Sequence, residues 1–240
     1  MKSLLKKTFL LSAFLSSSLI INAQHLKIGI QPGIGSYKMS ELKDLNKYVA
    51  NNVLHPKTIS NYPCYYYYQP VISLEFRYIS VGFLYSFHST GSRISIKDYS
   101  GEYRFDTKIK GKTFGIIVGG TLNPDKKIKF SLYSEIGLLQ SNLNLNEYFR
   151  VNNMQMVDNN YYFNSKNYYV EPGGKISYTF SFICFEMNFG YFKQFGNGYF
   201  EGKKGMKLTL DDKNIQPDWS GLRIGFSILL DFKLSEEDDE

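Results

Sequence analysis

The chain contains few of the residues that build disulfide frameworks or metal centres. Its 240 residues include two cysteines, three histidines and one tryptophan. Two cysteines are too few for a disulfide framework, and the scattered histidines (His25, His55 and His88) lack metal-ligand spacing. The sequence also lacks a glycine-rich phosphate-binding loop and a paired-cysteine motif. We therefore expect no metal and no cofactor.

Long apolar runs are also absent beyond the first 23 residues, which excludes a membrane-spanning helix there because such a helix needs about 20 apolar residues. The start of the chain reads as a cleavable signal peptide over residues 1–23. Lys2, Lys6 and Lys7 precede an apolar stretch at 9–21, and Ala23 offers a small-residue cleavage site. A retained signal anchor is the alternative. No cysteine lies near the junction, so a lipoprotein anchor is not expected.

Charge is modest and uneven along the chain. The formal net charge of +6 falls to +3 when the three leader lysines are removed. Five consecutive acids occupy 236–240, and we expect residues 233–240 to form a solvated acidic tail in the periplasm. The remaining chain is basic, but an exported protein without a binding motif is not expected to bind nucleic acid.

The most informative pattern that is present is alternation with a period of two. In residues 220–232 one set of positions is apolar and the other is rich in glycine and polar groups. A period of two places the two sets on opposite faces of a strand. The apolar set is Leu222, Ile224, Phe226, Ile228, Leu230 and Phe232, and the other set is Gly221, Arg223, Gly225, Ser227, Leu229 and Asp231.

Seven earlier segments carry the same alternation, and each is long enough for a tilted transmembrane strand of about 9–11 residues. The connections alternate between tight turns (79–81, 123–126, 182–183) and longer segments (37–68, 98–105, 141–167, 196–218). This pattern predicts an all-β fold over 24–232: a closed eight-stranded antiparallel transmembrane β-barrel with short periplasmic turns and long extracellular loops. The eight predicted strands are 26–36, 69–79, a third beginning at 81, 108–122, 127–140, 168–182, 183–195 and 220–232.

Two finer expectations follow from this topology. In the first long connection, Leu42, Leu45 and Val49 have the spacing of a short amphipathic helix over 39–53. Cys64 and Cys184 fall at opposite ends of the barrel. Because a disulfide needs Cα atoms within about 7 Å, no bridge is expected between them.

Charged residues fall on the predicted inward faces in equal numbers of each sign. Eight strands close a barrel that side chains about fill, so unpaired charge inside would be unfavourable and pairing is expected. Two interpretations stay open: a structural network of ion pairs that plugs the barrel, or a narrow path for ions or protons. The predicted network is Lys27, Glu75, Arg77, Lys129, Glu135, Glu171, Lys175, Glu186, Arg223 and Asp231.

Tyrosines gather at the predicted outer edge of the barrel, where a ring can meet acyl chains and a hydroxyl can meet water. We predict an interfacial belt here, with a carbohydrate- or protein-binding platform as the alternative. Basic residues of the outer segments, among them Lys108, Lys110 and Lys112, suggest outer-membrane lipid and lipopolysaccharide as partners. The predicted belt is Tyr65, Tyr66, Tyr67, Tyr68, Tyr168 and Tyr169.

No strong catalytic motif is present. His88 is predicted to face inward near the outer end of the third strand, beside Ser89 and across from Glu75. A histidine, a hydroxyl and a carboxylate suggest an esterase or deacylase. Ser89 should face lipid while His88 faces inward, and only Thr90 shares the side of His88. A hydrogen-bonded lumen histidine is the competing interpretation, and we assign no catalytic residue.

The mature chain resembles the outer-membrane protein β-barrel domain family of Gram-negative envelopes, in the size class of OmpA and OmpX. The residues that carry the resemblance are the 22–24 cleavage site, the Glu-Pro-Gly-Gly-Lys start at 171–175 and the final alternating strand ending at Phe232. The resemblance implies insertion by the barrel assembly machinery and location in the cell outer membrane. This chain departs from the family by continuing past Phe232.

Three functional hypotheses follow. The first is a monomeric, plugged, non-enzymatic barrel with a structural, adhesive or partner-binding role through its outer loops. The second is a lipid-active enzyme, which needs a histidine–hydroxyl–carboxylate cluster around His88. The third is a narrow channel, which needs a continuous wet path between the inward charges.

Overall fold

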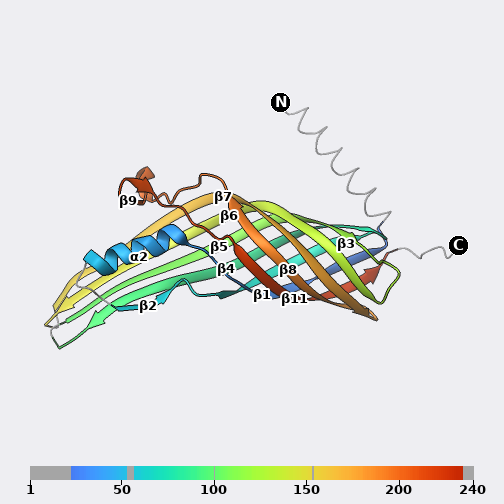
Figure 1. Cartoon of the computed structure of the whole chain (residues 1–240), viewed down its shortest axis with the longest axis horizontal. Helices are drawn as coiled ribbons and strands as arrows, with labels where there is room; N and C mark the ends of the chain where they lie inside the picture. The colour runs from blue at the N-terminus through green and yellow to red at the C-terminus, as the bar shows by residue number, and fades with distance from the viewer. Residues whose placement is uncertain (1–22, 53–56, 100, 153, 235–240) are drawn as a thin grey trace, which may run out of the picture.

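The computed structural model describes residues 23–52, 57–99, 101–152 and 154–234. Within these residues, eight antiparallel strands form a closed ring in which β11 returns to pair with β1 (Figure 1). The predicted eight-stranded barrel is therefore confirmed. In ring order, the strands are β1 (His25–Gly35), β3 (Tyr65–Glu75), β4 (Ile79–Lys97), β5 (Gly101–Thr121), β6 (Ile128–Val151), β7 (Met154–Phe180), β8 (Ile183–Phe195) and β11 (Gly221–Lys233).

Tight connections join β3 to β4, β5 to β6 and β7 to β8 at one end of the barrel, which we call the turn end. Both described ends of the chain lie there, as Figure 1 shows. The long connections, from β1 to β3 and from β8 to β11, lie at the opposite end, the loop end, whereas tight connections join β4 to β5 and β6 to β7. The two cysteines are free thiols at opposite ends, with Cys64 just before β3 and Cys184 just after the β7–β8 turn.

The strands differ greatly in length. β1, β3, β8 and β11 have 11 to 13 residues, whereas β4, β5, β6 and β7 have 19 to 27. The four longer strands continue past the loop end as a curved sheet, which we call the extension (Figure 1). A short strand, β2 (Lys57–Asn61), joins the far part of β4 at its edge.

The extension corrects two expectations. Of the predicted connection at 98–105, residues 101–105 belong to β5 and only 98–100 separate it from β4. Residues 141–167, predicted as a loop, are mostly paired strand: the β6–β7 ladder runs from Ile128↔Tyr178 to Val151↔Met154. The prediction missed this because the alternation reverses here. Leu143 and Leu145 point inward and are buried, while Asn142, Asn144 and Asn146 alternate with them.

The helix α2 (Ser40–Asn52) covers the concave face of the extension (Figure 1). Leu42, Leu45 and Val49 are buried, as their spacing predicted, and they belong to one apolar cluster with inward residues of the sheet. The helix forms because its apolar stripe has this partner surface. The sheet contributes Ile94 from β4, Tyr103, Phe105 and Ile109 from β5, Leu139, Leu143 and Leu145 from β6, and Phe163 from β7.

A network of hydrogen bonds between polar side chains connects the helix to the sheet. The Asn46 amide donates to Ser92 Oγ at 2.7 Å, and Ser92 Oγ lies 2.6 Å from Thr107 Oγ1. The Tyr62 hydroxyl is 2.7 Å from the same Thr107 oxygen. Burial raises the pKa of Tyr62 to about 12. The tyrosine therefore stays neutral, and this hydrogen-bond network is insensitive to pH across the physiological range.

The connection from β8 to β11 is hydrogen-bonded to α2 and to the residue before the helix. It contains the 3₁₀ turn η1 (Lys203–Gly205) and a two-stranded sheet of β9 (Thr209–Leu210) and β10 (Lys213–Asn214). The Gln216 backbone N–H donates to Glu41 Oε2 at 2.6 Å, and the Met39 N–H donates to the Asp218 carbonyl at 2.9 Å. Helix and connection are thus fastened together over the loop end of the barrel.

No helix in the described ranges has the length and apolar character needed to cross a membrane. The predicted signal peptide, apart from Ala23, and the last six residues of the predicted acidic tail lie outside the described residues.

We predict that Leu42→Ala destabilises the docked helix by about 2–5 kcal/mol, because it removes a fully buried side chain from the apolar cluster. Hydrogen exchange of the α2 amides in the refolded protein would measure this as faster exchange. Lys47→Ala, at an exposed position of the same helix, should leave that exchange unchanged. Equal protection in the two variants would contradict the packing described above.

Candidate functional site

Two clusters of charged side chains occupy the barrel lumen. In the cluster nearer the turn end, the Lys27 ammonium contacts Glu75 and lies 3.8 Å from Glu186 Oε1. Lys175 approaches the same Glu186 oxygen at 3.3 Å. The side chains of Lys27, Glu75 and Glu186 are no more than 7 % exposed, so these ion pairs are shielded from water. The cluster spans β1, β3, β7 and β8 and links walls on opposite sides of the ring.

The second cluster surrounds Arg223 of β11, nearer the loop end of the barrel. The guanidinium donates to Glu171 Oε2 at 3.2 Å and lies over the rings of Phe192 and Tyr67, at 4.1 and 4.8 Å from their centroids. Both charged partners are at most 2 % exposed. Glu135 is opposite Glu171 in the β6–β7 register, and its Oε1 accepts a 2.8 Å hydrogen bond from the Gln69 amide.

Aromatic rings close the lumen above Arg223. Trp219 makes edge contacts with Tyr37 and His88, at centroid distances of 4.7 and 4.3 Å. Tyr169 stacks on Phe192 at 4.7 Å. These five side chains are at most 6 % exposed, and the Trp219 indole N–H donates to Ser141 Oγ at 2.9 Å. We call this set the aromatic plug: Tyr37, His88, Tyr169, Phe192 and Trp219.

Most of the predicted inward charges lie in or beside the lumen. Asp231 lies at the turn end, where its carboxylate is 2.7 Å from His25 Nδ1, and Lys129 is half-buried near the same end. The prediction is wrong for Arg77. That residue is in the exposed β3–β4 turn and pairs with Asp125 at 3.3 Å, because β3 ends at Glu75 instead of continuing to 79.

The predicted tyrosine belt is only partly interfacial. Tyr66, Tyr68 and Tyr168 are exposed on the outer face, whereas Tyr67 and Tyr169 point inward and are buried. The run of tyrosines is part of strand β3, so alternate residues must face opposite sides. Tyr65 is the first residue of β3, at the loop end. It occupies an inward-facing position of the strand but is exposed. Placing the start of the second predicted strand at 65 instead of 69 would have revealed that Tyr67 faces inward.

The surroundings of His88 do not match the enzymatic hypothesis. His88 Nδ1 is 3.3 Å from Arg223 Nη2, and the ring is buried among aromatic side chains. The Thr90 hydroxyl donates to the Pro63 carbonyl, and Glu75 belongs to the Lys27 cluster. Within the described residues, no carboxylate and hydroxyl converge on this histidine.

A row of lysines follows the apolar band on the outer face of β5. Phe114, Ile116 and Val118 are exposed, and the next outward positions toward the loop end are Lys112, Lys110 and Lys108. In register, Lys112 is beside Gln140, which is beside Lys166 of β7. The apolar band fits hydrocarbon and the lysine row fits the headgroup layer. The boundary between them falls between residues 112 and 114.

Comparison with known proteins gives structural likeness but no family assignment. No family model matches the chain, and no curated protein matches it. Among solved structures, 16 chains match. Neisserial surface protein A (NspA) is 8 % identical, with a TM-score of 0.38 over 88 % of this chain and 97 % of that chain. The outer membrane protein OprG from Pseudomonas aeruginosa is 12 % identical, with a TM-score of 0.43 over 88 % and 97 %.

A third match is Ail, the attachment invasion locus protein of Yersinia pestis, solved in complex with the heparin analogue sucrose octasulfate. It is 12 % identical, with a TM-score of 0.39 over 86 % of this chain and 99 % of that chain. All three matches have low sequence identity and low TM-scores. No residue role is transferred from them.

We predict that Arg223→Met lowers the free energy of unfolding by about 3–5 kcal/mol, because Glu171 would stay buried without its cation. Chemical unfolding of the refolded barrel, followed by tryptophan fluorescence, measures the loss. Adding Glu171→Gln to Arg223→Met should restore much of it. Arg77→Met, which breaks an exposed ion pair, should change stability by about 1 kcal/mol or less. Similar losses in the two single variants would contradict a buried network.

Proposed function

We propose that this protein is a closed outer-membrane β-barrel without a pore, which displays a folded extracellular extension as a binding surface. The observation that carries the proposal is the filled lumen. Buried ion pairs occupy its lower part, and the aromatic plug covers Arg223. A chain built in this way serves as an anchor and a scaffold.

The filled lumen argues against the channel hypothesis. Conduction needs a continuous wet path, and the cross-section at Arg223 is packed with Phe192 and Tyr67 on the guanidinium. Toward the loop end, Trp219 is held by a hydrogen bond to Ser141 and by the Gln194 side chain, whose Oε1 accepts from the Trp219 backbone N–H at 3.2 Å. An ion would have to displace these packed rings.

The extension supports the binding role. Its own apolar cluster and the docked helix hold it in one shape, so its outer surface is preorganised for a partner. That surface is polar and includes Arg93 and Arg104, both paired with Asp106 at 2.7 and 3.3 Å. Exposed methionines near the β6–β7 tip (Met154 and Met156) and exposed tyrosines farther along β7 (Tyr161 and Tyr162) add contact area. An adhesive or partner-binding role fits this combination.

The proposed setting is the outer membrane of a Gram-negative envelope, with the turn end in the periplasm and the extension outside. The lysine row then lies at the outer headgroup layer, where lipopolysaccharide phosphates are its natural partners. Insertion by the barrel assembly machinery and a monomeric state complete the proposal.

Planar-bilayer recording of the refolded mature protein tests the proposal. We expect no unitary conductance from the parent or from Arg77→Gln, whose substitution lies outside the lumen. Glu75→Gln and Arg223→Ala report on the two lumen clusters. Stable, charge-selective openings of the parent that change with these two substitutions would refute the closed barrel and make the inward charges a permeation path.

A further inference from the structure

The barrel wall formed by β1, β8 and β11 ends differently from the opposite wall. These three strands stop near the loop end, and β1 leads through residues 36–39 into α2, which runs above their ends (Figure 1). The outward residues Leu222 and Tyr191 are register partners there, and they are 65 % and 37 % exposed. Beyond the ends of these three strands, the helix therefore forms the outer surface.

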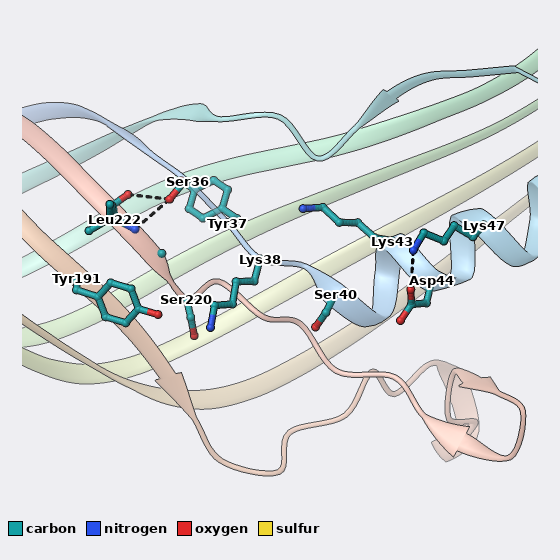
Figure 2. A pocket seen from close by; sticks show the side chains of 11 residues that line it. Ser36, Tyr37, Lys38, Ser40, Lys43, Asp44, Lys47, Tyr191, Ser220 and Leu222 are labelled. Carbon is teal, nitrogen blue, oxygen red and sulfur yellow. Dashed lines mark hydrogen bonds and ion pairs between the residues drawn. The ribbon is translucent and has the colours of Figure 1, made fainter.

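A hollow of 640 Å³ lies between the strand ends and the helix. Tyr191 and Leu222 line it beside the strand ends, and Lys38, Lys43 and Lys47 line it from α2 and the segment before the helix (Figure 2). Figure 2 shows Lys43 extending from the helix toward the strand ends. The volume is in the range of small-molecule sites. We call it the rim hollow.

The rim hollow is electropositive. Three lysines and one aspartate line it, so its formal net charge is +2. Asp44 pairs with Lys47 at 3.5 Å, and the nearby Glu41 carboxylate accepts the Gln216 backbone N–H. Lys38 and Lys43 have no acidic partner among the described ion pairs, so they are the cations available to an anion.

An apolar groove continues from the rim hollow down the outer wall. The two share Ser36 and Leu222, and the groove has a volume of 540 Å³. It runs between β1 and β11, where the side-chain-free partners Gly33 and Gly225 face each other in the register. Its other lining residues are mainly apolar: Pro32, Ile34, Cys64, Met187, Ile224 and Phe226.

Pro32 explains part of this shape. Pairing between β1 and β11 skips from Ile30↔Ile228 to Gly33↔Gly225, and Pro32 lies in the gap because it has no N–H to donate. The interrupted ladder at Pro32, whose compact ring lies on the outward parity with Ile30 and Ile34, leaves the wall shallow at this point. Gly33 and Gly225 lack side chains on the lumen side, where Tyr67 lies. A linear hydrocarbon chain fits such a groove.

From this geometry we propose that the wall binds one phosphate-bearing lipid of the outer leaflet, with its headgroup in the rim hollow and an acyl chain in the groove. Lys38 and Lys43 contact the phosphate, and the Tyr191 hydroxyl lies at the level of the headgroup. The lysine row on the opposite wall meets lipid as a general surface, whereas here cations and an apolar groove are joined in one site. The inference rests on the proposed outer-membrane location.

Native mass spectrometry of the refolded mature protein, released from micelles with added diphosphoryl lipid A, tests the site. We expect one lipid A to be retained per barrel, and much less phosphatidylcholine under the same conditions. Lys38→Gln with Lys43→Gln should weaken retention roughly thirtyfold, since two cations near the headgroup are lost. Leu222→Trp should weaken it by a similar factor through the groove, and its outward, exposed position keeps the barrel intact.

The matched control is Lys203→Gln with Lys207→Gln, which removes the same charge from exposed residues away from the rim. It should retain lipid A as the parent does. Unchanged retention in the rim variants, an equal loss in the control, or equal retention of phosphatidylcholine would overturn the site. Conductance is recorded on the same preparations, so a closed barrel that fails to retain lipid refutes the lipid site alone.

Discussion

A strand that crosses hydrocarbon must find hydrogen-bonding partners for its backbone on both sides, because lipid offers none. In this chain the requirement is met by closing eight strands into a ring, with β11 returning to β1 from Leu26↔Phe232 to Gly35↔Arg223. Ring closure at eight strands fixes a narrow interior. The inward residues must then fill that interior, and the charges among them must pair.

The charges are distributed to satisfy this condition. Lys27 and Lys175 share Glu186 near the turn end, and Arg223 pairs with Glu171 nearer the loop end. Inward glycines make room for these long side chains; a Cβ on Gly190 would lie 2.5 Å from Glu171 Oε1. The same narrow interior that makes unpaired charge unfavourable supports the proposed closed lumen.

Strand β5 shows how one strand serves two solvents. In its barrel part, Phe114 and Ile116 face outward and Thr113 faces inward. Beyond the boundary the arrangement inverts: Lys108 faces outward, while Phe105 is buried beneath the helix. Alternation with a period of two is kept throughout, and only the side that receives the apolar residues changes. The extension is therefore a water-exposed sheet formed by the same strands that form the membrane barrel.

This inversion also explains what sequence reasoning found and missed. The β8 strand at 183–195 and the helix over Leu42, Leu45 and Val49 were predictable because each carries one uninterrupted pattern. The 141–167 hairpin was not predictable from outward apolar residues, since none are needed above the membrane. Tyr67 was missed as a lumen residue because the predicted strand begins at 69 instead of 65. Trp219 was missed because it lies outside the alternating strands and its partner, His88, is distant in sequence.

The most direct test of the account is a depth measurement along β5. Nitroxide labels at the outward positions 106, 108, 110, 112, 114, 116 and 118, one at a time in a Cys64→Ser/Cys184→Ala background, report oxygen and nickel-chelate accessibility in bilayers. A boundary between barrel and extension at this depth predicts aqueous labels at 106, 108 and 110 and lipid-exposed labels at 114, 116 and 118, with the change near 112. Lipid exposure at 106 or 108, or aqueous exposure at 116 or 118, would contradict it.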